Sequence, residues 1–558
     1  MACRSAVLLF FSFVSSCVMA AGELDASFGT AGVVISGFSE RSVTGQSLAI
    51  QPDGKIVVAG YSTLEGGLDA DGFVLMRHLS DGTLDPSFGN GGRLWHPIAG
   101  GGSAKCVRLQ TDGRIVVAGS VYAGAGSSFV VARYLPNGSA DASFNGTGYV
   151  ITSISGNLDF ANSLVVQPDG KIVVAGTKSD ASGINDDFVL VRYTNTGGLD
   201  SGFNGSGIQT TSIGAGRDYA GSIALQDDGK LIVAGSSQQG GGNDMVVARY
   251  TSSGIPDTTF SGDGIALIST EADDAGQSVA IQNDGKILLA GYSFTNGGSD
   301  FALLRLNSDG TRDASFGSAG IAVTLVSSGN DVGQSVVVQA NGKIVVAGYS
   351  LVSGDADFAF ARYTSNGMLD NTFSGVGTKT VPVAAGMDFA QEVQLQADGS
   401  IVGAGFSEVA FLSRFALVRL RGDAPMTQSQ LWRKAYFGSD ENAGPGADLN
   451  DPDGDGAVNL MEFALGTDPT GFNRPSTRPL LQGTQLDVYF TRLRNSAAET
   501  SIALESSESL HGTWVTEASE VPSLVKDGGI QEFKFSIAKG SAPKRFFRLR
   551  VKRVPDQE

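Results

Sequence analysis

A ten-residue segment that occurs seven times along the chain constrains the fold more than any other feature. It is first found as QPDGKIVVAG at residues 51–60. Related segments follow at residues 110–119, 167–176, 226–235, 282–291, 339–348 and 396–405, so their closing glycines lie 56 to 59 residues apart. A period this regular over most of the chain indicates a repeat architecture.

Each repeat predicts four short strands. In the first copy, residues 47–51 read as an apolar strand, residues 52–54 have the Pro-Asp-Gly chemistry of a tight turn, and residues 55–59 form a second strand rich in β-branched side chains. A third run follows at residues 73–77, and runs such as residues 32–36 supply the fourth strand. Four strands per unit without helical periodicity predict an all-β, seven-bladed β-propeller with four-stranded blades.

A second spacing predicts how the ring closes. In six repeats an arginine ends the third strand and an aspartate follows eight residues later. The pairs are Arg77 and Asp85, Arg133 and Asp141, Arg192 and Asp200, Arg249 and Asp257, Arg305 and Asp313, and Arg362 and Asp370. Arg419 has no such aspartate after it and Asp25 has no arginine before it, so a closed ring would pair these two residues.

These arginines and aspartates are interpreted as structural ion pairs. The arginines share a strand face with apolar residues that should pack between blades, and a charge in that position is tolerated only when it is paired. The alternative is a ring of anion-binding sites.

The repeat resembles a known bacterial family. The combination L-D-x-S-F-G followed by Q-P-D-G-K-I-V-V-A-G is similar to the delta-60 repeat, and the resemblance covers roughly residues 24–421. It implies a secreted or surface-exposed bacterial β-propeller. It supplies no catalytic residues that could be transferred to this chain.

The N-terminus predicts export. Residues 1–20 carry Arg4, an apolar run and small residues before Ala21, which is the pattern of a signal peptide. The segment VSSC ending at Cys17 also resembles a lipoprotein box, so a lipid anchor at Cys17 is an open alternative. No segment is a good membrane span. We therefore expect a secreted or cell-envelope protein of bacteria.

Charge and the rarer residue types narrow the chemistry. A net charge of −18 argues against nucleic acid or an anionic membrane as a partner. His78, His96 and His511 share no repeat position, so a histidine-based site is not expected. Cys106 stands where other repeats carry serine, which favours a small buried residue over a nucleophile.

The variable loops predict a ligand-binding face. Repeat length varies mainly between the second and third strands, and an aspartate recurs on the same expected face, just before the innermost strand. These residues are Asp159, Asp218, Asp274, Asp331 and Asp388. We interpret them as an acidic rim around the central channel that would bind cations or polyhydroxylated ligands. The alternative is that each aspartate caps its own turn.

The sharpest chemical motif is DPDGDGAVNLME at residues 451–462, which matches the calcium loop of an EF-hand without a gap. The expected Ca²⁺ ligands are Asp451, Asp453, Asp455, Ala457, Asn459 and Glu462. Residues 459–469 are similar to dockerin-like and thrombospondin-type-3-like calcium modules of secreted bacterial proteins. A solvated turn without an ion is the alternative.

The sequence thus predicts four parts: a signal peptide at 1–20, the propeller at 21–421, a short helical calcium-binding connector at 422–471 and a β-sandwich at 472–558. We interpret the chain as a binding or adhesion protein of the cell envelope, with a glycan or protein as its unidentified surface ligand. One alternative is a propeller enzyme, a polysaccharide or peptide lyase or hydrolase with carboxylates at the channel mouth. It would need a non-repeated polar cluster, whereas the aspartates are repeated. The other is a purely structural surface protein.

Overall fold

The computed structural model describes residues 21–423 except 65–69, 99, 124–125, 183, 241, 270–272, 296 and 410–411. Beyond them it describes Tyr436, Pro452, Asn459 and the strands β29–β35. The chain divides into two compact units, Met1–Ala424 and Pro425–Glu558. Among the described residues, no helix combines the length and the apolar character needed to cross a membrane.

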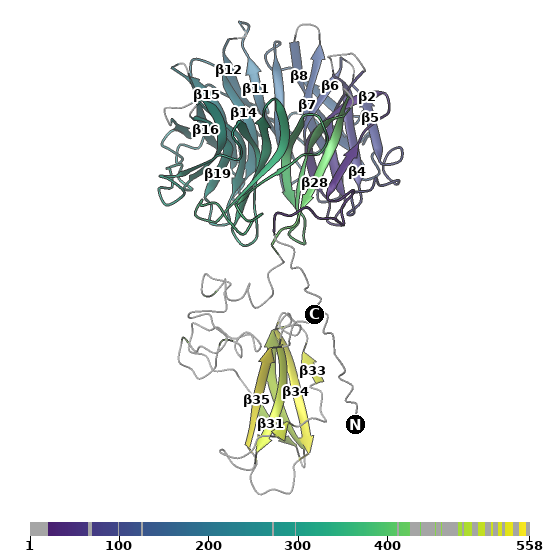
Figure 1. The fold of residues 1–558 in the computed structure, drawn as a ribbon, viewed down its shortest axis with the longest axis vertical. Coiled ribbons are helices and arrows are strands. Elements are labelled where there is room, and N and C mark those ends of the chain that lie inside the picture. The colour runs from purple at the N-terminus through teal and green to yellow at the C-terminus, as the bar shows by residue number, and fades with distance from the viewer. Residues whose placement is uncertain are drawn as a thin grey trace, which may run out of the picture. The chain divides into compact units, whose positions relative to one another are not determined.

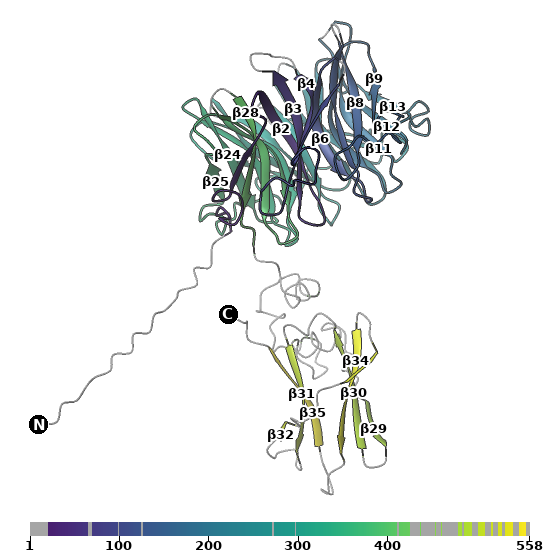
Figure 2. The ribbon, with the colours of Figure 1, turned by 90° about the vertical axis from the view of Figure 1, so that its right-hand side faces the viewer.

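The first unit is a seven-bladed propeller in which every blade is a four-stranded antiparallel sheet (Figures 1 and 2). Blades 1 to 3 comprise β2 (Arg41–Ile50), β3 (Ile56–Leu64), β4 (Ala70–His78) and β5 (Arg93–Pro97); β6 (Gly102–Leu109), β7 (Ile115–Ala123), β8 (Gly126–Tyr134) and β9 (Tyr149–Thr152); and β10 (Asp159–Val166), β11 (Ile172–Ser179), β12 (Asp186–Tyr193) and β13 (Ile208–Thr211). The predicted fold class is confirmed for this unit.

The remaining blades repeat the same order. Blades 4 to 6 comprise β14 (Asp218–Leu225), β15 (Leu231–Gln239), β16 (Gly242–Tyr250) and β17 (Ile265–Ile268); β18 (Asp274–Ile281), β19 (Ile287–Thr295), β20 (Gly298–Leu306) and β21 (Ile321–Thr324); and β22 (Asn330–Val338), β23 (Ile344–Val352), β24 (Asp355–Tyr363) and β25 (Thr378–Val381). Blade 7 comprises β26 (Asp388–Leu395), β27 (Ile401–Val409), β28 (Leu412–Leu420) and, from the start of the chain, β1 (Val33–Ser36).

The core lies between neighbouring blades. Val57 and Ala59 of blade 1 pack in one buried cluster with Ile115 and Val117 of blade 2, and similar clusters join the other blades. The second and third strands are therefore buried on both faces. This explains why residues 56–59 form a continuous apolar run instead of alternating with polar side chains.

The glycine that closes each ten-residue motif is required by a bulge in the innermost strand. The pairing of β2 with β3 shifts register between Gly45 and Ser47, and the other six blades have the same irregularity. Opposite the bulge, a Cβ on Gly60 would collide with the carbonyl oxygen of Thr44. The equivalent glycines, Gly119, Gly176, Gly235, Gly291, Gly348 and Gly405, face a carbonyl in the same way.

The N-terminal segment closes the ring, as the spacing of arginine and aspartate predicts. β1 pairs antiparallel with β28, with Val33 opposite Val418 and Ser36 opposite Phe415. In Figure 1 the dark purple start of the chain lies beside the green β28. The Gly22 N–H donates to the Arg421 carbonyl at 2.8 Å, which continues the seam beyond the strand.

The second unit contains two described antiparallel sheets, drawn in yellow in Figure 1. Their strands are β29 (Arg478–Gln482), β30 (Gln485–Leu493), β34 (Ile530–Ala538) and β33 (Ser523–Lys526) in one sheet, and β32 (Val515–Thr516), β31 (Thr500–Ser507) and β35 (Phe546–Arg553) in the other. The predicted signal peptide at 1–20 and most of the predicted connector lie outside the described residues.

Candidate functional site

The two faces of the propeller differ in chemistry. The turns between first and second strands, such as residues 51–55, define what we call the hairpin face. The loops between second and third strands define the opposite loop face. Asp159, at the start of β10, pairs in register with Lys178, near the end of β11. The predicted aspartates and the variable loops therefore share one face.

A ring of arginine–aspartate pairs lies on the hairpin face. All seven expected pairs are ion pairs, with 2.7–2.8 Å between the guanidinium nitrogen and Oδ2. Each guanidinium also stacks on a phenylalanine ring at 4.4–4.9 Å. Arg192 also donates to the Ser252 carbonyl of the next blade at 2.6 Å. The pairs thus join neighbouring blades.

Each of these aspartates has a second cationic partner, which the sequence analysis did not assign. Lys171 lies 3.2 Å from Asp200, and Lys286 lies 3.0 Å from Asp313. These lysines are the K of the QPDGK motif. Their recurrence at one repeat position was the feature of the sequence that could have predicted the second ion pair. Blade 7 has Ser400 there, and its Asp25 instead has Arg421 at 3.7 Å.

The electrostatics of these aspartates fit a structural role. Burial raises the pKa of Asp85, but hydrogen bonds from Ser87 and the charge of Arg77 outweigh it and lower this pKa to about 2. Because the guanidinium donors already bind acceptors of the same chain, the alternative of an anion-binding ring is not favoured.

The five predicted rim aspartates are fully buried, so they do not form an acidic surface. Asp159 accepts a hydrogen bond from the backbone N–H of Ile154 at 2.9 Å, and Asp331 accepts one from Val326 at 2.8 Å. Asp218 and Asp388 make the equivalent bonds, while Asp274 follows the undescribed residues 270–272. This geometry matches the alternative in which each aspartate caps its own loop.

The axial channel contains a cavity of about 90 Å³ that is lined by the innermost strand of every blade. One residue per blade, at the bulge, forms what we call the amide ring because five of its seven members are amides. Its members are Gln46, Lys105, Asn162, Gly221, Gln277, Gln334 and Gln391. Cys106 lines the same cavity and is 3% exposed, and burial raises the pKa of its thiol.

A layer of aromatic residues lies two positions nearer the loop face. We call it the aromatic collar. Its members are Tyr61, Phe160, Tyr219, Tyr292, Tyr349, Phe389 and Phe406. Phe389 contacts Tyr349 and Phe406 at centroid distances of 4.8 and 5.1 Å. Gly221 is the member of the amide ring that lacks a side chain. A Cβ added to it would lie 3.3 Å from the phenol ring of Tyr219, so Tyr219 covers this position.

One polar cluster in the channel is not repeated among the blades. Arg108 of blade 2 forms an ion pair with Glu392 of blade 7 at 3.0 Å. Glu392 also accepts hydrogen bonds from the Ser47 hydroxyl and the Leu48 N–H. Lys105 donates to the Gln46 side-chain oxygen at 3.0 Å. Other blades carry uncharged residues at all three positions.

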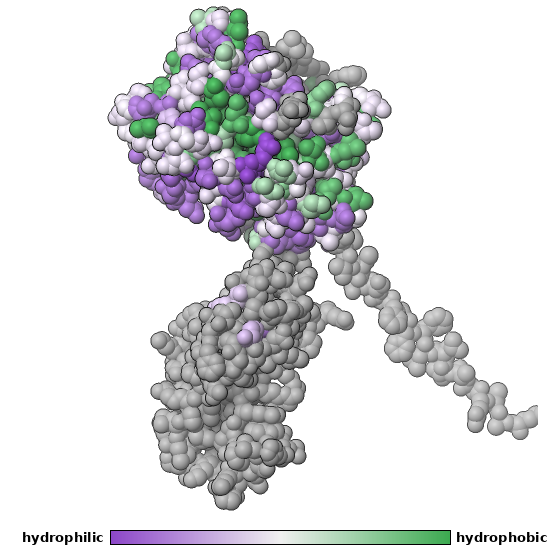
Figure 3. Space-filling view, turned by 90° about the vertical axis from the view of Figure 1, so that its left-hand side faces the viewer, coloured by the Kyte–Doolittle hydropathy of each residue, from purple (hydrophilic) through white to green (hydrophobic). Residues whose placement is uncertain are grey.

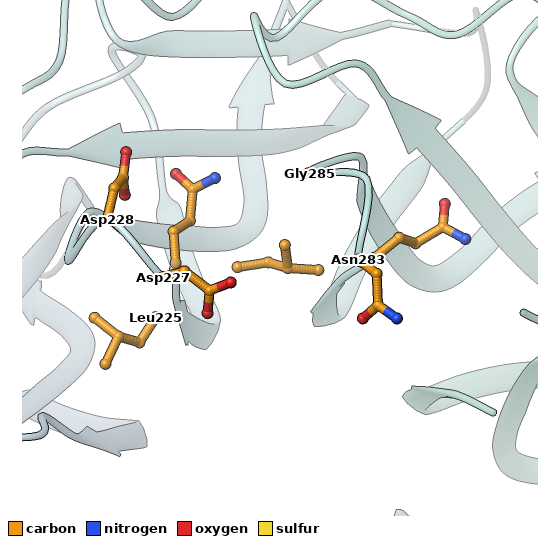
Figure 4. A pocket seen from close by; sticks show the side chains of 8 residues that line it. Leu225, Asp227, Asp228, Asn283 and Gly285 are labelled. Carbon is orange, nitrogen blue, oxygen red and sulfur yellow. The ribbon is translucent and has the colours of Figure 1, made fainter. Parts of the chain in front are cut away.

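A second hollow, of about 340 Å³, lies between the hairpin turns of blades 4 and 5. Leu225, Asp227 and Asp228 come from one turn, and Asn283 and Gly285 come from the next; Asp227 and Asn283 stand on opposite sides in Figure 4. It is an open groove between repeated turns.

The outer strands expose apolar side chains. Ile35, Trp95, Ile151, Leu267 and Val323 occupy equivalent positions on the rim and are 37–45% exposed. Figure 3 shows one side of the molecule, where hydrophobic residues form several groups among hydrophilic ones.

Of the six predicted calcium ligands, only Asn459 is described, and it is buried. Asp451, Asp453, Asp455, Ala457 and Glu462 lie outside the described residues. Within the described part, no group of three or more His, Cys, Asp or Glu side chains is placed to hold a metal ion.

Six segments match the family described as "Domain of unknown function (DUF5122) beta-propeller", at residues 51–88, 110–144, 167–203, 226–260, 282–316 and 339–373. The chain is a β-propeller repeat protein. Each match begins at the turn after the innermost strand and includes the second and third strands of its blade, in blades 1 to 6. The propeller's more specific resemblance to the delta-60 repeat stays a prediction.

Solved propellers are only remotely similar to this one. A catalytically inactive virginiamycin B lyase from Staphylococcus aureus, with quinupristin, is 12% identical, with 69% of this chain and 98% of that chain covered and a TM-score of 0.42. Sqt1 from Chaetomium thermophilum is 14% identical, with coverage of 66% and 80% and a TM-score of 0.37. The endosialidase of phage phi92 is 9% identical, with coverage of 70% and 69% and a TM-score of 0.37. No curated protein matches the chain.

Proposed function

We propose that the chain is a ligand-binding protein whose propeller binds its ligand at the loop-face mouth of the axial channel. The observation that carries this proposal is the non-repeated lining of the channel. The blades reuse the same residues wherever they build the scaffold. Lys105, Arg108 and Glu392 break that pattern at a cavity that all seven blades share. An aromatic layer next to a few convergent polar groups is the usual composition of a ligand site.

Binding accounts for this site better than catalysis does. A general acid or base must be able to exchange a proton with its substrate. Glu392 is the carboxylate of the cavity, and it is held by Arg108, Ser47 and Leu48. These donors, together with the Gln394 side-chain amide, suit a fixed structural charge at the channel wall.

The proposal includes the cellular setting that the sequence predicts. Residues 1–20 would direct export to the bacterial envelope, either with cleavage before Ala21 or with lipidation at Cys17. Residues 422–471 would form a helical connector stabilised by Ca²⁺, and residues 472–558 a β-sandwich that presents the propeller at the surface. The support is the signal pattern, the calcium-loop motif and the described strands of the second unit.

A ligand screen with a blocked-mouth variant tests the proposed function. Residues 21–558 are applied to arrays of glycans and surface peptides, with and without calcium. The variant is Ser103→Tyr, which gives blade 2 the aromatic side chain that blade 4 carries as Tyr219 at the equivalent position. We expect ligands that bind the native chain to be lost by the variant. A ligand retained in full would place binding elsewhere and contradict the proposal.

Calcium binding is tested on the same chain by titration calorimetry. We expect one Ca²⁺ to bind with a dissociation constant of about 10⁻⁴–10⁻³ M, as in extracellular modules. Glu462→Gln should abolish the heat, because it removes the bidentate ligand expected at the end of the loop. Asp423→Asn is the matched control, because it removes a carboxylate that pairs with Lys343 and Arg362 outside the loop. An unchanged titration in Glu462→Gln, or no heat up to about 10 mM, would rule the site out.

A further inference from the structure

We infer that the channel mouth binds the carboxylate-bearing end of an acidic glycan, with the sugar ring in the aromatic collar and the carboxylate on Lys105. The inference rests on the proposed binding function and names its ligand class. Four observations carry it: an ammonium group without a counter-ion, the size of the cavity, the polarity of its lining and the absence of a blade 2 aromatic residue from the collar.

The first observation is the state of Lys105. Among the lysines described within residues 21–423 it is the one without an ion pair, and it donates a hydrogen bond to the neutral Gln46 side chain. Its side chain lines the channel cavity, and desolvation by the surrounding protein lowers its pKa. A cation held in such a place is stabilised by an anion that enters the channel. The whole chain carries a net charge of −18, so its overall field repels anions. The attraction for an anionic ligand would therefore come from the Lys105 ammonium group itself.

The second observation is size. The cavity at the amide ring is about 90 Å³, which admits a carboxylate group together with water. We place the sugar ring one layer nearer the loop face, against the collar. The collar is two residues away along each innermost strand, which is roughly 7 Å and close to the length of one sugar unit.

The third observation is the chemistry of the two layers. The amides of Gln46, Asn162, Gln277, Gln334 and Gln391 line the cavity. Each offers both a donor and an acceptor, which suits hydroxyl groups. The aromatic rings above them offer flat apolar faces against which the C–H face of a sugar can pack. Tyr219 is 40% exposed, so part of its ring is available to a ligand.

The fourth observation fixes the orientation. Blade 2 has Ser103 and Ser120, both buried, where blade 7 has Phe389 and Phe406, so blade 2 contributes no aromatic side chain to the collar. Lys105 belongs to that same blade. A sugar packed against the aromatic rings of the other blades would direct its carboxylate toward the ammonium on blade 2. Beneath it, Arg108 is neutralised by Glu392, which leaves Lys105 as the net positive group of the site.

Calorimetry with a matched pair of ligands tests this inference. Trigalacturonate and its methyl ester differ in charge and in the added methyl groups, and benzoate supplies a carboxylate on an aromatic ring without sugar hydroxyls. We expect trigalacturonate to bind the native chain about tenfold or more tighter than its ester, because a hydrogen bond to a charged group is worth at least this much. Benzoate should bind more weakly than trigalacturonate.

Variants separate the parts of the site. Lys105→Gln should abolish the preference for the acid over the ester, and Ser103→Tyr should abolish binding of both. Lys178→Gln removes a positive charge that is paired with Asp187 on the loop face, away from the cavity, and should bind like the native chain. Melting temperatures close to that of the native chain would show that the variants are folded.

The opposing outcomes are distinct. An acid preference that survives in Lys105→Gln, equal binding of benzoate, or no binding of uronate oligosaccharides up to about 10 mM would overturn the inference. A neutral glycan or a peptide that binds the native chain and is lost in Ser103→Tyr would also overturn it, while keeping the proposed function. A ligand that binds the Ser103→Tyr variant as well as it binds the native chain would contradict both the inference and the proposed function.

Discussion

The closing glycine of each repeat stands where any side chain would strike the backbone of the same blade. At Gly235 an added Cβ would collide with the Tyr219 carbonyl, whereas Gly242 has open space around it and no positive φ. We expect Gly235→Ala to lower the free energy of unfolding by about 1–3 kcal/mol, the usual cost of overpacking. Gly242→Ala is the matched control, and urea denaturation measures both. Equal midpoints for the two variants would contradict the bulge explanation.

His78 is a single residue with a separable pH effect. Burial, together with the charge of Arg93, lowers its pKa to about 4, from 6.5 in the unfolded chain. As pH falls from 6.5 toward 4, the unfolded state takes up a proton that the folded state does not, so stability is lost in this window. Four other blades carry tyrosine here, and the Tyr193 hydroxyl bonds Thr152 at 2.8 Å as His78 bonds Ser36 at 3.1 Å.

We therefore expect His78→Tyr to flatten the stability profile between pH 6.5 and pH 4 while it keeps the bond to Ser36. Urea midpoints at pH values across the window provide the measurement. His96→Tyr, at a half-buried histidine on a different strand, is the comparison. A profile unchanged by His78→Tyr would show that the histidine is not the source of the pH dependence.

At the scale of elements, the segment before β2 supplies what blade 7 lacks. It provides the outer strand β1, the carboxylate of Asp25 and the Ala21 carbonyl that accepts from the Ser374 N–H at 2.8 Å. In the other blades the equivalent carbonyl belongs to the turn after the third strand, such as Asn137. The seam therefore reproduces the contacts of the continuous blades.

We expect deletion of residues 21–37 to lower the melting temperature and to promote dimers. Removal of one partner of a buried ion pair costs about 3–5 kcal/mol, and Arg419 would lose Asp25. The uncovered edge of β28 would also be open to pairing with a second chain. Calorimetry and light scattering measure the two effects. Asp25→Asn, which keeps the strand, should destabilise without dimerisation; a monomeric deletion variant would show that β1 does not protect this edge.

Comparison of these elements shows what the sequence could predict. The blade number and the ring closure followed from spacing, because the arginine and its aspartate recur eight residues apart in a fixed register. The burial of the five rim aspartates could not be predicted. An aspartate that caps a loop and an aspartate that is exposed to bind a ligand look the same in the sequence, as Asp159 shows. The collar was not predicted, because its aromatic residue lies on the first strand in some blades and on the second strand in others. No single repeat position therefore shows a recurring aromatic residue, and only blade 7 has one at both positions, Phe389 and Phe406.

At the scale of the whole molecule, the seven aspartates of the arginine–aspartate ring all have a lowered pKa, so they make the stability of the propeller depend on pH in the same acidic range. Burial raises the pKa of Asp141 and Asp257, but hydrogen bonds and the paired arginines lower it to about 2 in both. The usual value is 3.8. As pH falls from this value through about 2, the unfolded state binds more protons than the folded state, so stability is lost in that window.

We expect the propeller to be stable down to about pH 4 and to unfold cooperatively as pH falls from about 4 to 2. Circular dichroism during acid titration measures the transition. Asp141→Asn should remove part of its steepness, whereas Asp53→Asn, at an exposed turn, should change it less. A native chain that stays folded below pH 2, or a transition complete above pH 5, would contradict the account.

The seam also decides how the propeller carries mechanical load. Residues 22 and 421 are hydrogen-bonded neighbours, and β1 runs antiparallel to β28 away from this point. Tension that pulls these two positions apart would open the seam one bond at a time, like a zipper, and would leave blades 1 to 6 unloaded until β1 came free. If the chain is tethered from one of these positions alone, drag on the propeller bypasses the seam. The site of attachment would then set the force at which the ring opens.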